Sequence, residues 1–286
     1  MRALLRTAER ATRLLATGRS GGKGRKPGWL SAAVDFTITG LRPGSTILDI
    51  EAPRLGGVAG LDLDQQDFWL QQPDVDDTAL DLAALAISEA QNAEASGDRF
   101  DSSVLEAILE LGNAARTGGV RYELVPCKSG GRRFVLEDTA CPRIRERISL
   151  IPAPSAAVVS GQLDEIGHDQ GRFRLLLGKH GTLPGRLDRA VLDVETLRPL
   201  WGRQATVEGL VHFKSNGQPR LIEARRITTG AAHDAIFEKL PIAVASGSRA
   251  RTTQPVAKRL RHVDPMVLWG AWPGNDSIEE LLAELD

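Results

Sequence analysis

The chain has 286 residues, of which 42% are hydrophobic and 26% are charged, an ordinary composition for a globular protein. With a formal net charge of −1, the protein has no strong overall positive potential that would attract it to nucleic acid or to an anionic membrane. No apolar run approaches the roughly 20 residues that a membrane span needs, so we predict a cytoplasmic protein.

Residues 1–30 are predicted to form an N-terminal helix and a linker. Apolar residues recur at helical spacing, at Leu4, Leu5, Ala8, Ala11, Leu14 and Leu15. The following stretch GRSGGKGRKPG is rich in glycine and predicts a flexible linker. It lacks the spacing of a phosphate-binding loop, because Gly24 stands where a Ser or Thr must hold magnesium.

Residues 31–152 are predicted to form an α+β domain. The alternating runs FTIT and TILDIEA, joined through Pro43-Gly44, predict a hairpin. One helix should begin near Thr78, and a second should open with a capping box between Ser103 and Glu106. The runs VRYELV, RRFVLE and RISLIP predict three further strands, so the expected order is ββααβββ.

Residues 153–230 are predicted to form a small β-barrel after the Pro-rich hinge IPAPSAA. Three strands, a short helical turn at VETLRPLWG and two further strands have the order of the OB-fold, with an SH3-like barrel as the alternative. Gly161 and Gly209 should be bulges or bends. Phe173 and Phe213 fit the core, and Trp201 is expected to plug the barrel.

Cys127 and Cys141 fall on segments that we expect to be neighbouring strands. A disulfide between them is one alternative, but two cysteines in so long a chain favour free thiols in a reducing compartment.

We find no catalytic or metal-binding constellation in the sequence. The five histidines are scattered, and none pairs with another His or a Cys at metal-ligand spacing. Acidic residues at 74–77 are explained by a helix N-terminus. We therefore predict that the protein is not an enzyme and needs neither metal nor cofactor, with an unrecognised hydrolase as the least favoured hypothesis.

A minor positive face on the barrel is the only candidate nucleic-acid site that we find. Arg172 and Arg174 should point to the same side of their strand, because side chains alternate along a strand. OB-folds often bind single strands with such a face and with stacking aromatics. A solvated face without a ligand is the favoured interpretation of the two arginines.

Residues 231–286 are predicted to form a linker and an extended tail that ends in a helix. In the stretch LWGAWPGNDSIEELLAELD, Ser277 is a good N-cap and Glu280 completes a capping box. The helix carries one apolar stripe, formed by Ile278, Leu281, Leu282 and Leu285. A helix this short is marginal alone, so another protein must cover the stripe and two tryptophans, unless the tail folds back onto its own domains.

This tail resembles the C-terminal end of bacterial type II antitoxins that pair with PIN-domain ribonuclease toxins. The matching residues are Leu268, Gly270, Trp272, Pro273, Gly274, Asp276, Glu279, Glu280, Leu281 and Leu282. The resemblance implies a hetero-oligomer in which the tail wraps the groove of the toxin and neutralises it. It also implies that Arg259 or Arg261 reaches the acidic metal site of the toxin, where an arginine would form charge-assisted hydrogen bonds.

The expected partner-binding residues are therefore Arg259, Arg261, Leu268, Trp269, Trp272, Pro273, Ile278, Leu281, Leu282 and Leu285. The N-terminus shows no signature of the small DNA-binding module with which such antitoxins usually begin, so the resemblance does not extend to autoregulation of transcription. The alternative function is that of an OB-type nucleic-acid-binding protein whose tail recruits a partner.

Overall fold

The computed structural model describes residues 1–21, 26–42, 47–61, 63, 73–92, 94–118, 121–127, 131–167, 171–188 and 191–243. All of them belong to one compact unit, Met1–Ser246. It contains both helices and strands and includes a closed five-stranded barrel, so an α+β fold with a small barrel is confirmed.

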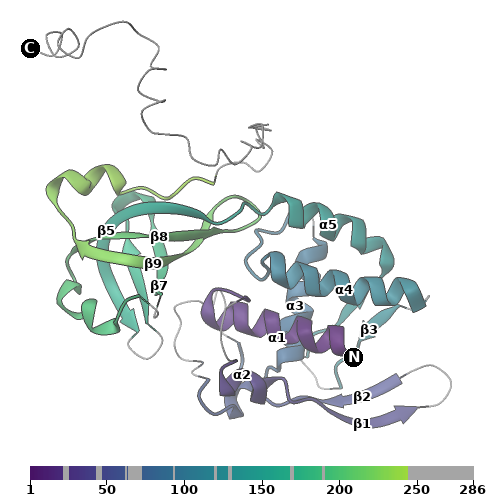
Figure 1. The fold of residues 1–286 in the computed structure, drawn as a ribbon. Helices are drawn as coiled ribbons and strands as arrows, with labels where there is room; N and C mark the ends of the chain where they lie inside the picture. The colour runs from purple at the N-terminus through teal and green to yellow at the C-terminus, as the bar shows by residue number, and fades with distance from the viewer. Residues whose placement is uncertain are drawn as a thin grey trace, which may run out of the picture. The chain divides into compact units, whose positions relative to one another are not determined.

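Four helices build the first core, and Figure 1 shows them side by side. They are α1 (Arg2–Thr17), α3 (Ala79–Gln91), α4 (Ser102–Gly118) and α5 (Cys141–Leu150). The predicted N-terminal helix is thus confirmed; α1 packs against α3 and α4, and its Ala11 and Leu14 are buried in their shared core. Gly18 ends α1 in the left-handed conformation, with φ of 74°, which glycine adopts without a steric penalty.

The two central helices are capped by acidic and hydroxyl side chains. Thr78 and Asp81 form a capping box at the start of α3, close to the predicted start. The capping box predicted between Ser103 and Glu106 is wrong, because α4 already begins at Ser102. Instead, the Asp101 carboxylate accepts a hydrogen bond from the backbone N–H of Val104 at 2.9 Å.

Two small antiparallel hairpins accompany the helices. They are β1 (Thr37–Arg42) with β2 (Ile47–Glu51), and β3 (Tyr122–Leu124) with β4 (Phe134–Leu136). The pairing of β1 and β2 confirms the predicted hairpin, whose turn residues Pro43-Gly44 lie outside the described residues. VRYELV and RRFVLE each contribute one short strand. A six-residue helix, α2 (Gly28–Ala33), precedes β1.

The strand predicted from RISLIP is wrong, because most of this stretch is the end of α5. Three buried side chains, those of Cys141, Ile144 and Arg147, follow one another at a spacing of three, which places them on one side of a helix. The guanidinium of Arg147 lies 5.4 Å from the centre of the Phe100 ring, within the range of a cation–π contact. Cys127 and Cys141 are both free, and they do not lie on neighbouring strands.

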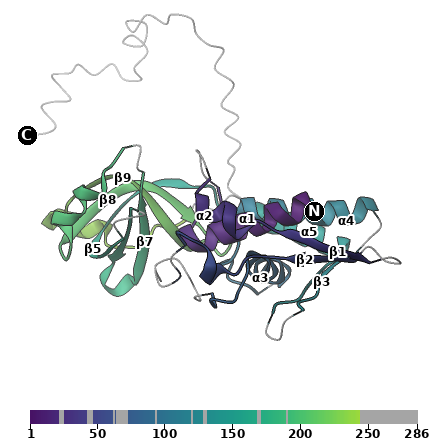
Figure 2. The same cartoon turned by 90° about the horizontal axis from the view of Figure 1, so that it is seen from below.

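The second core lies inside the barrel. Figure 2 shows the curved strands of the barrel. Its strands are β5 (Ser155–Gly167), β6 (Arg172–Leu176), β7 (Thr182–Leu187), β8 (Gln204–Phe213) and β9 (Pro219–Thr229). They follow the order β5-β6-β7-β9-β8, and β8 pairs with β5 to close the barrel. The pair β7 and β9 is parallel, and the other pairs are antiparallel.

Glycines occur where barrel strands come too close for a side chain. A Cβ on Gly161 would lie 2.6 Å from the Leu176 carbonyl oxygen, and one on Gly209 would lie 2.2 Å from the Glu223 carbonyl oxygen. The register shifts at Gly209, so the bulge predicted there is confirmed. A turn at Asn216-Gly217 joins β8 to β9, with a φ of 79° at Gly217.

Short 3₁₀ helices fill the remaining connections. They are η1 (Leu55–Gly57), η2 (Asp138–Ala140), η3 (Gly178–His180), η4 (Val194–Thr196), η5 (Arg198–Leu200) and η6 (Ala232–Phe237). The helical turn predicted between the third and fourth barrel strands therefore consists of η4 and η5. Leu197 and Leu200, which are 0% and 8% exposed, point into the barrel core from this connection.

Candidate functional site

The two predicted aromatic core residues of the barrel are buried, but its tryptophan is not. Phe173 and Phe213 are each 3% exposed and belong to the barrel core, as predicted. Trp201 is 67% exposed, so the prediction that it plugs the barrel is wrong. Its indole Nε1 donates a hydrogen bond to the backbone oxygen of Asp164 at 3.0 Å, which holds the ring on the outer surface.

The two predicted nucleic-acid-binding arginines lie on β6 in different surroundings. Arg172 is a buried residue with 5% exposure. The guanidinium of Arg174 is partly exposed and forms ion pairs at 2.6 Å with Asp164 and at 2.8 Å with Glu165. These carboxylates offset much of the positive charge that a nucleic-acid phosphate would meet at Arg174.

The predicted partner-binding residues lie outside the described residues. They are Arg259, Arg261, Leu268, Trp269, Trp272, Pro273, Ile278, Leu281, Leu282 and Leu285.

A group of polar and charged side chains links strands β8 and β9 to the segment that follows α1 and to the loop before α4. We call this group the seam, and it consists of Arg19, Ser20, Asp98, Asp101, His212, Lys214, Arg220 and Glu223. The N-terminal side of the seam is an ion pair in which Arg19 Nη1 lies 2.5 Å and 2.6 Å from the two carboxylate oxygens of Glu223. Both side chains are less than a quarter exposed, so water screens this pair only partly.

His212 lies beside this ion pair. Its Nε2 atom is 3.6 Å from a carboxylate oxygen of Glu223, and it is buried without a hydrogen-bond partner. Burial and the charge of Arg19 lower the pKa of His212, and the Glu223 carboxylate raises it by less. The imidazole is therefore held neutral at neutral pH.

Arg220 lies at the centre of the seam, where its side chain binds the backbone of the loop before α4. Its guanidinium donates hydrogen bonds to the carbonyl oxygens of Asp98 and Phe100, each at 2.7 Å, and to that of Gly97. Lys214 adds an ion pair with Asp98 at 2.5 Å. Because carbonyl oxygens of an irregular loop have no ladder partners, a guanidinium with five donors can satisfy several of them together.

The seam is completed by the residue that caps α4. Ser20 donates from its backbone N–H and its hydroxyl to the Asp101 carboxylate, at 3.0 Å and 2.6 Å. Asp101 therefore joins the end of the N-terminal segment to the start of α4. Two residues of the predicted flexible linker, Arg19 and Ser20, are thus held by specific contacts, and neither carries a sequence signal of its partner.

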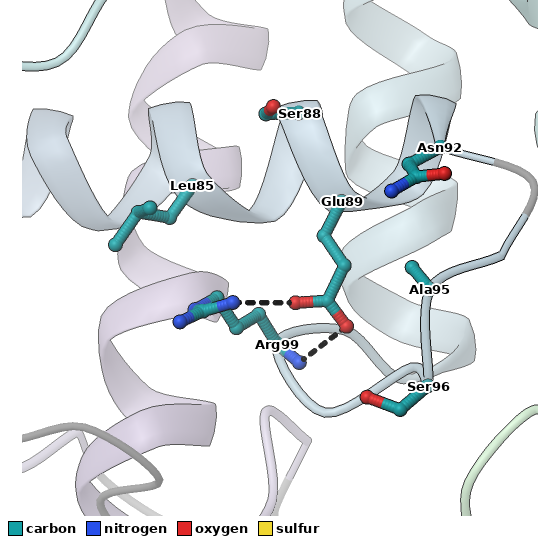
Figure 3. A pocket seen from close by; sticks show the side chains of 7 residues that line it. All are labelled: Leu85, Ser88, Glu89, Asn92, Ala95, Ser96 and Arg99. Atoms are coloured by element: carbon teal, nitrogen blue, oxygen red, sulfur yellow. Dashed lines mark hydrogen bonds and ion pairs between the residues drawn. The ribbon is translucent and has the colours of Figure 1, made fainter.

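A hollow of about 320 Å³ is formed by residues of α3 and of the loop that follows it. It is lined by Leu85, Ser88, Glu89, Asn92, Ala95, Ser96 and Arg99. Figure 3 shows the Glu89 carboxylate pointing from α3 to Arg99, whose Nη1 donates to it at 3.0 Å. The same carboxylate accepts a hydrogen bond from the backbone N–H of Asp98 at 2.8 Å, so its charge stabilises the loop.

The described residues contain no group of three or more His, Cys, Asp or Glu side chains that could hold a metal ion. Every helix in the described ranges is also too short or too polar to cross a membrane. Comparisons with protein-family models, curated proteins and solved structures find no match to this chain.

Proposed function

We propose that this protein binds and neutralises a partner nuclease of the PIN-domain type through residues 258–286. The observation that carries the proposal is the order of features in the tail: two tryptophans, the Trp-Pro-Gly turn and a capped acidic helix with one apolar stripe. This order resembles that of bacterial antitoxins. Trp and Arg, which the segment contains, are also the side chains that most often anchor protein interfaces.

The described residues form two apolar cores. Leu163, Phe173 and Phe213 fill the barrel together with Leu197 from the connection before β8. The helices enclose Phe100 in the same way. In our proposal the partner covers the indoles and leucines of the tail.

The test uses the full chain, a shortened chain of residues 1–257, and the ribonuclease encoded by the adjacent reading frame. We expect the full chain to bind this ribonuclease and inhibit its cleavage of RNA, and the shortened chain to lose both properties. An unchanged thermal unfolding midpoint of the described unit would show that the deletion acts on binding. Binding and inhibition that survive the deletion would overturn the proposal.

Point variants separate anchoring from inhibition. Trp269→Ala and Trp272→Ala should weaken binding, because each removes a large apolar contact. Arg259→Ala and Arg261→Ala should weaken inhibition more than binding. Trp201→Ala is the matched control, since Trp201 is an exposed tryptophan of the barrel, and this variant should bind and inhibit as the unaltered chain does.

A second candidate function is favoured by the strand order of the barrel. We interpret the order β5-β6-β7-β9-β8, with its parallel pair β7 and β9, as OB-like, and OB-folds often bind single-stranded nucleic acid. Salt-dependent binding of a single-stranded oligonucleotide, weakened by Arg174→Ala but not by Arg198→Ala, would favour this function over the first.

A further inference from the structure

The seam contains equal numbers of fixed positive and negative charges. Arg19, Lys214 and Arg220 are the cations, and Asp98, Asp101 and Glu223 are the carboxylates. Arg19 is paired with Glu223, Lys214 with Asp98, and Asp101 accepts hydrogen bonds from Ser20. Each carboxylate thus already has a donor when His212 is neutral.

His212 is the titratable group of the seam whose charge changes near physiological pH. Charged groups face it from every element that packs around it: Arg19 from the segment after α1, Asp101 from the start of α4, and Glu223 from β9. Lys214 follows directly after the end of β8, two residues along from His212. A proton on His212 would therefore enter a region in which the nearest carboxylate, that of Glu223, already has both oxygens bonded to Arg19.

Geometry also leaves the protonated imidazole poorly accommodated. Nε2 is buried and makes no hydrogen bond, and its distance of 3.6 Å from Glu223 is longer than a hydrogen bond. A charged imidazole would be repelled by the neighbouring Arg19 and would compete with Arg19 for the Glu223 carboxylate. Both effects weaken the ion pair that joins β9 to the segment that holds Arg19.

We propose that the seam is an acid-sensitive latch, in which protonation of His212 loosens the contact of strands β8 and β9 with Arg19 and with the loop at residues 97–101. Below the ordinary His value of 6.5 the unfolded chain takes up this proton more readily than the seam does, because the pKa of His212 is lowered. The stabilisation is therefore complete above this pH and decreases as the pH falls. The proposal does not depend on the function of the tail.

The test is hydrogen exchange of the full chain at pH 7.5 and pH 5.5, followed in peptides that cover residues 97–101 and 212–223. After correction for the intrinsic pH dependence of exchange, we expect opening of both segments to increase severalfold at pH 5.5. The increase should disappear in His212→Gln, which cannot be protonated. It should persist in His180→Gln, the matched control, because His180 is an exposed histidine of the same barrel.

The same pH response in His212→Gln and in the unaltered chain would overturn the proposal, and so would an unaltered chain whose exchange does not change with pH. If His212→Gln does not fold, nuclear magnetic resonance of the unaltered chain decides. Titration of the His212 ring below its ordinary pKa of 6.5 supports the latch, and titration at or above that value overturns it.

Discussion

The guanidinium of Arg19 contacts the carboxylate of Glu223 across 204 residues of sequence, with one nitrogen 2.5 Å and 2.6 Å from the two oxygens. Arg19 follows the first helix, and Glu223 lies on the last strand of the barrel. The pair therefore connects the two ends of the described fold, and its removal should affect both the helices and the barrel.

Arg19→Met should lower the free energy of unfolding by about 1 to 3 kcal/mol, because it leaves a partly buried carboxylate without its cation. Urea unfolding measures this change. Arg198→Met is the control, since Arg198 is 85% exposed and 4.0 Å from Glu195, and it should cost less than about 0.5 kcal/mol. Arg19→Met should also raise the pKa of His212, because the Arg19 charge helps to lower it. If Arg19→Met and Arg198→Met lost equal amounts of unfolding free energy, the ion pair of Arg19 and Glu223 would not contribute to stability.

Arg220→Met should destabilise the chain by about 2 to 4 kcal/mol, because three loop carbonyl groups would lose their common donor. The loss is measurable by urea unfolding. Arg226→Met, at an exposed position of the same strand, should be nearly neutral. If Arg220→Met were as mild as this control, water would be replacing the guanidinium, and the loop would not depend on Arg220.

Gly185→Ala should destabilise the barrel by about 1 to 3 kcal/mol through overpacking. A Cβ at this position would lie 2.1 Å from a ring carbon of Phe173, a buried residue that can move little. Gly28→Ala is the matched control, since a Cβ there meets nothing within 4 Å and alanine favours a helix. Thermal unfolding should show a lower midpoint for Gly185→Ala and an equal or higher one for Gly28→Ala; a reversed order would contradict the packing.

Asp98 should contribute to the loss of stability in acid. Burial by itself would raise the pKa of Asp98, but hydrogen bonds from Lys214 and Ser96 outweigh it, so the pKa lies below the ordinary 3.8. The stabilisation is therefore present above pH 3.8 and is lost as the pH falls through the lowered pKa. Unfolding free energies between pH 6 and pH 3 should fall less steeply for Asp98→Asn than for Glu94→Gln, a variant of an exposed acid in the same loop. Equal slopes would show that Asp98 is not involved.

The barrel strands could be predicted because their signals are local. Alternating side chains, strand glycines and the Asn216-Gly217 turn each act over a few residues, and the strands between residues 155 and 229 follow them. Helix α5 could not be predicted in this way. Its buried side includes Arg147, whose contact partner Phe100 comes from a distant loop, and a charged residue weakens the apolar periodicity that indicates a helix.

The seam could not be predicted for a related reason. Its members come from four separate stretches of sequence, and each is a charged or hydroxyl residue that would also fit a solvated surface. Only the packing of β8 and β9 beside residues 19–20 brings the charges together, and tertiary packing leaves no periodic mark in a sequence.

The position of Arg19 so early in the chain bears on how the protein can be divided. A shortened form that begins at residue 27 would lack Arg19, the cation that pairs with Glu223. It would also lack Ser20, whose hydroxyl donates a hydrogen bond to Asp101. Expressed alone, the barrel would have the Glu223 carboxylate without its cation and the His212 ring more exposed to water. The first twenty residues therefore belong with the barrel in any fragment intended to preserve its native surface.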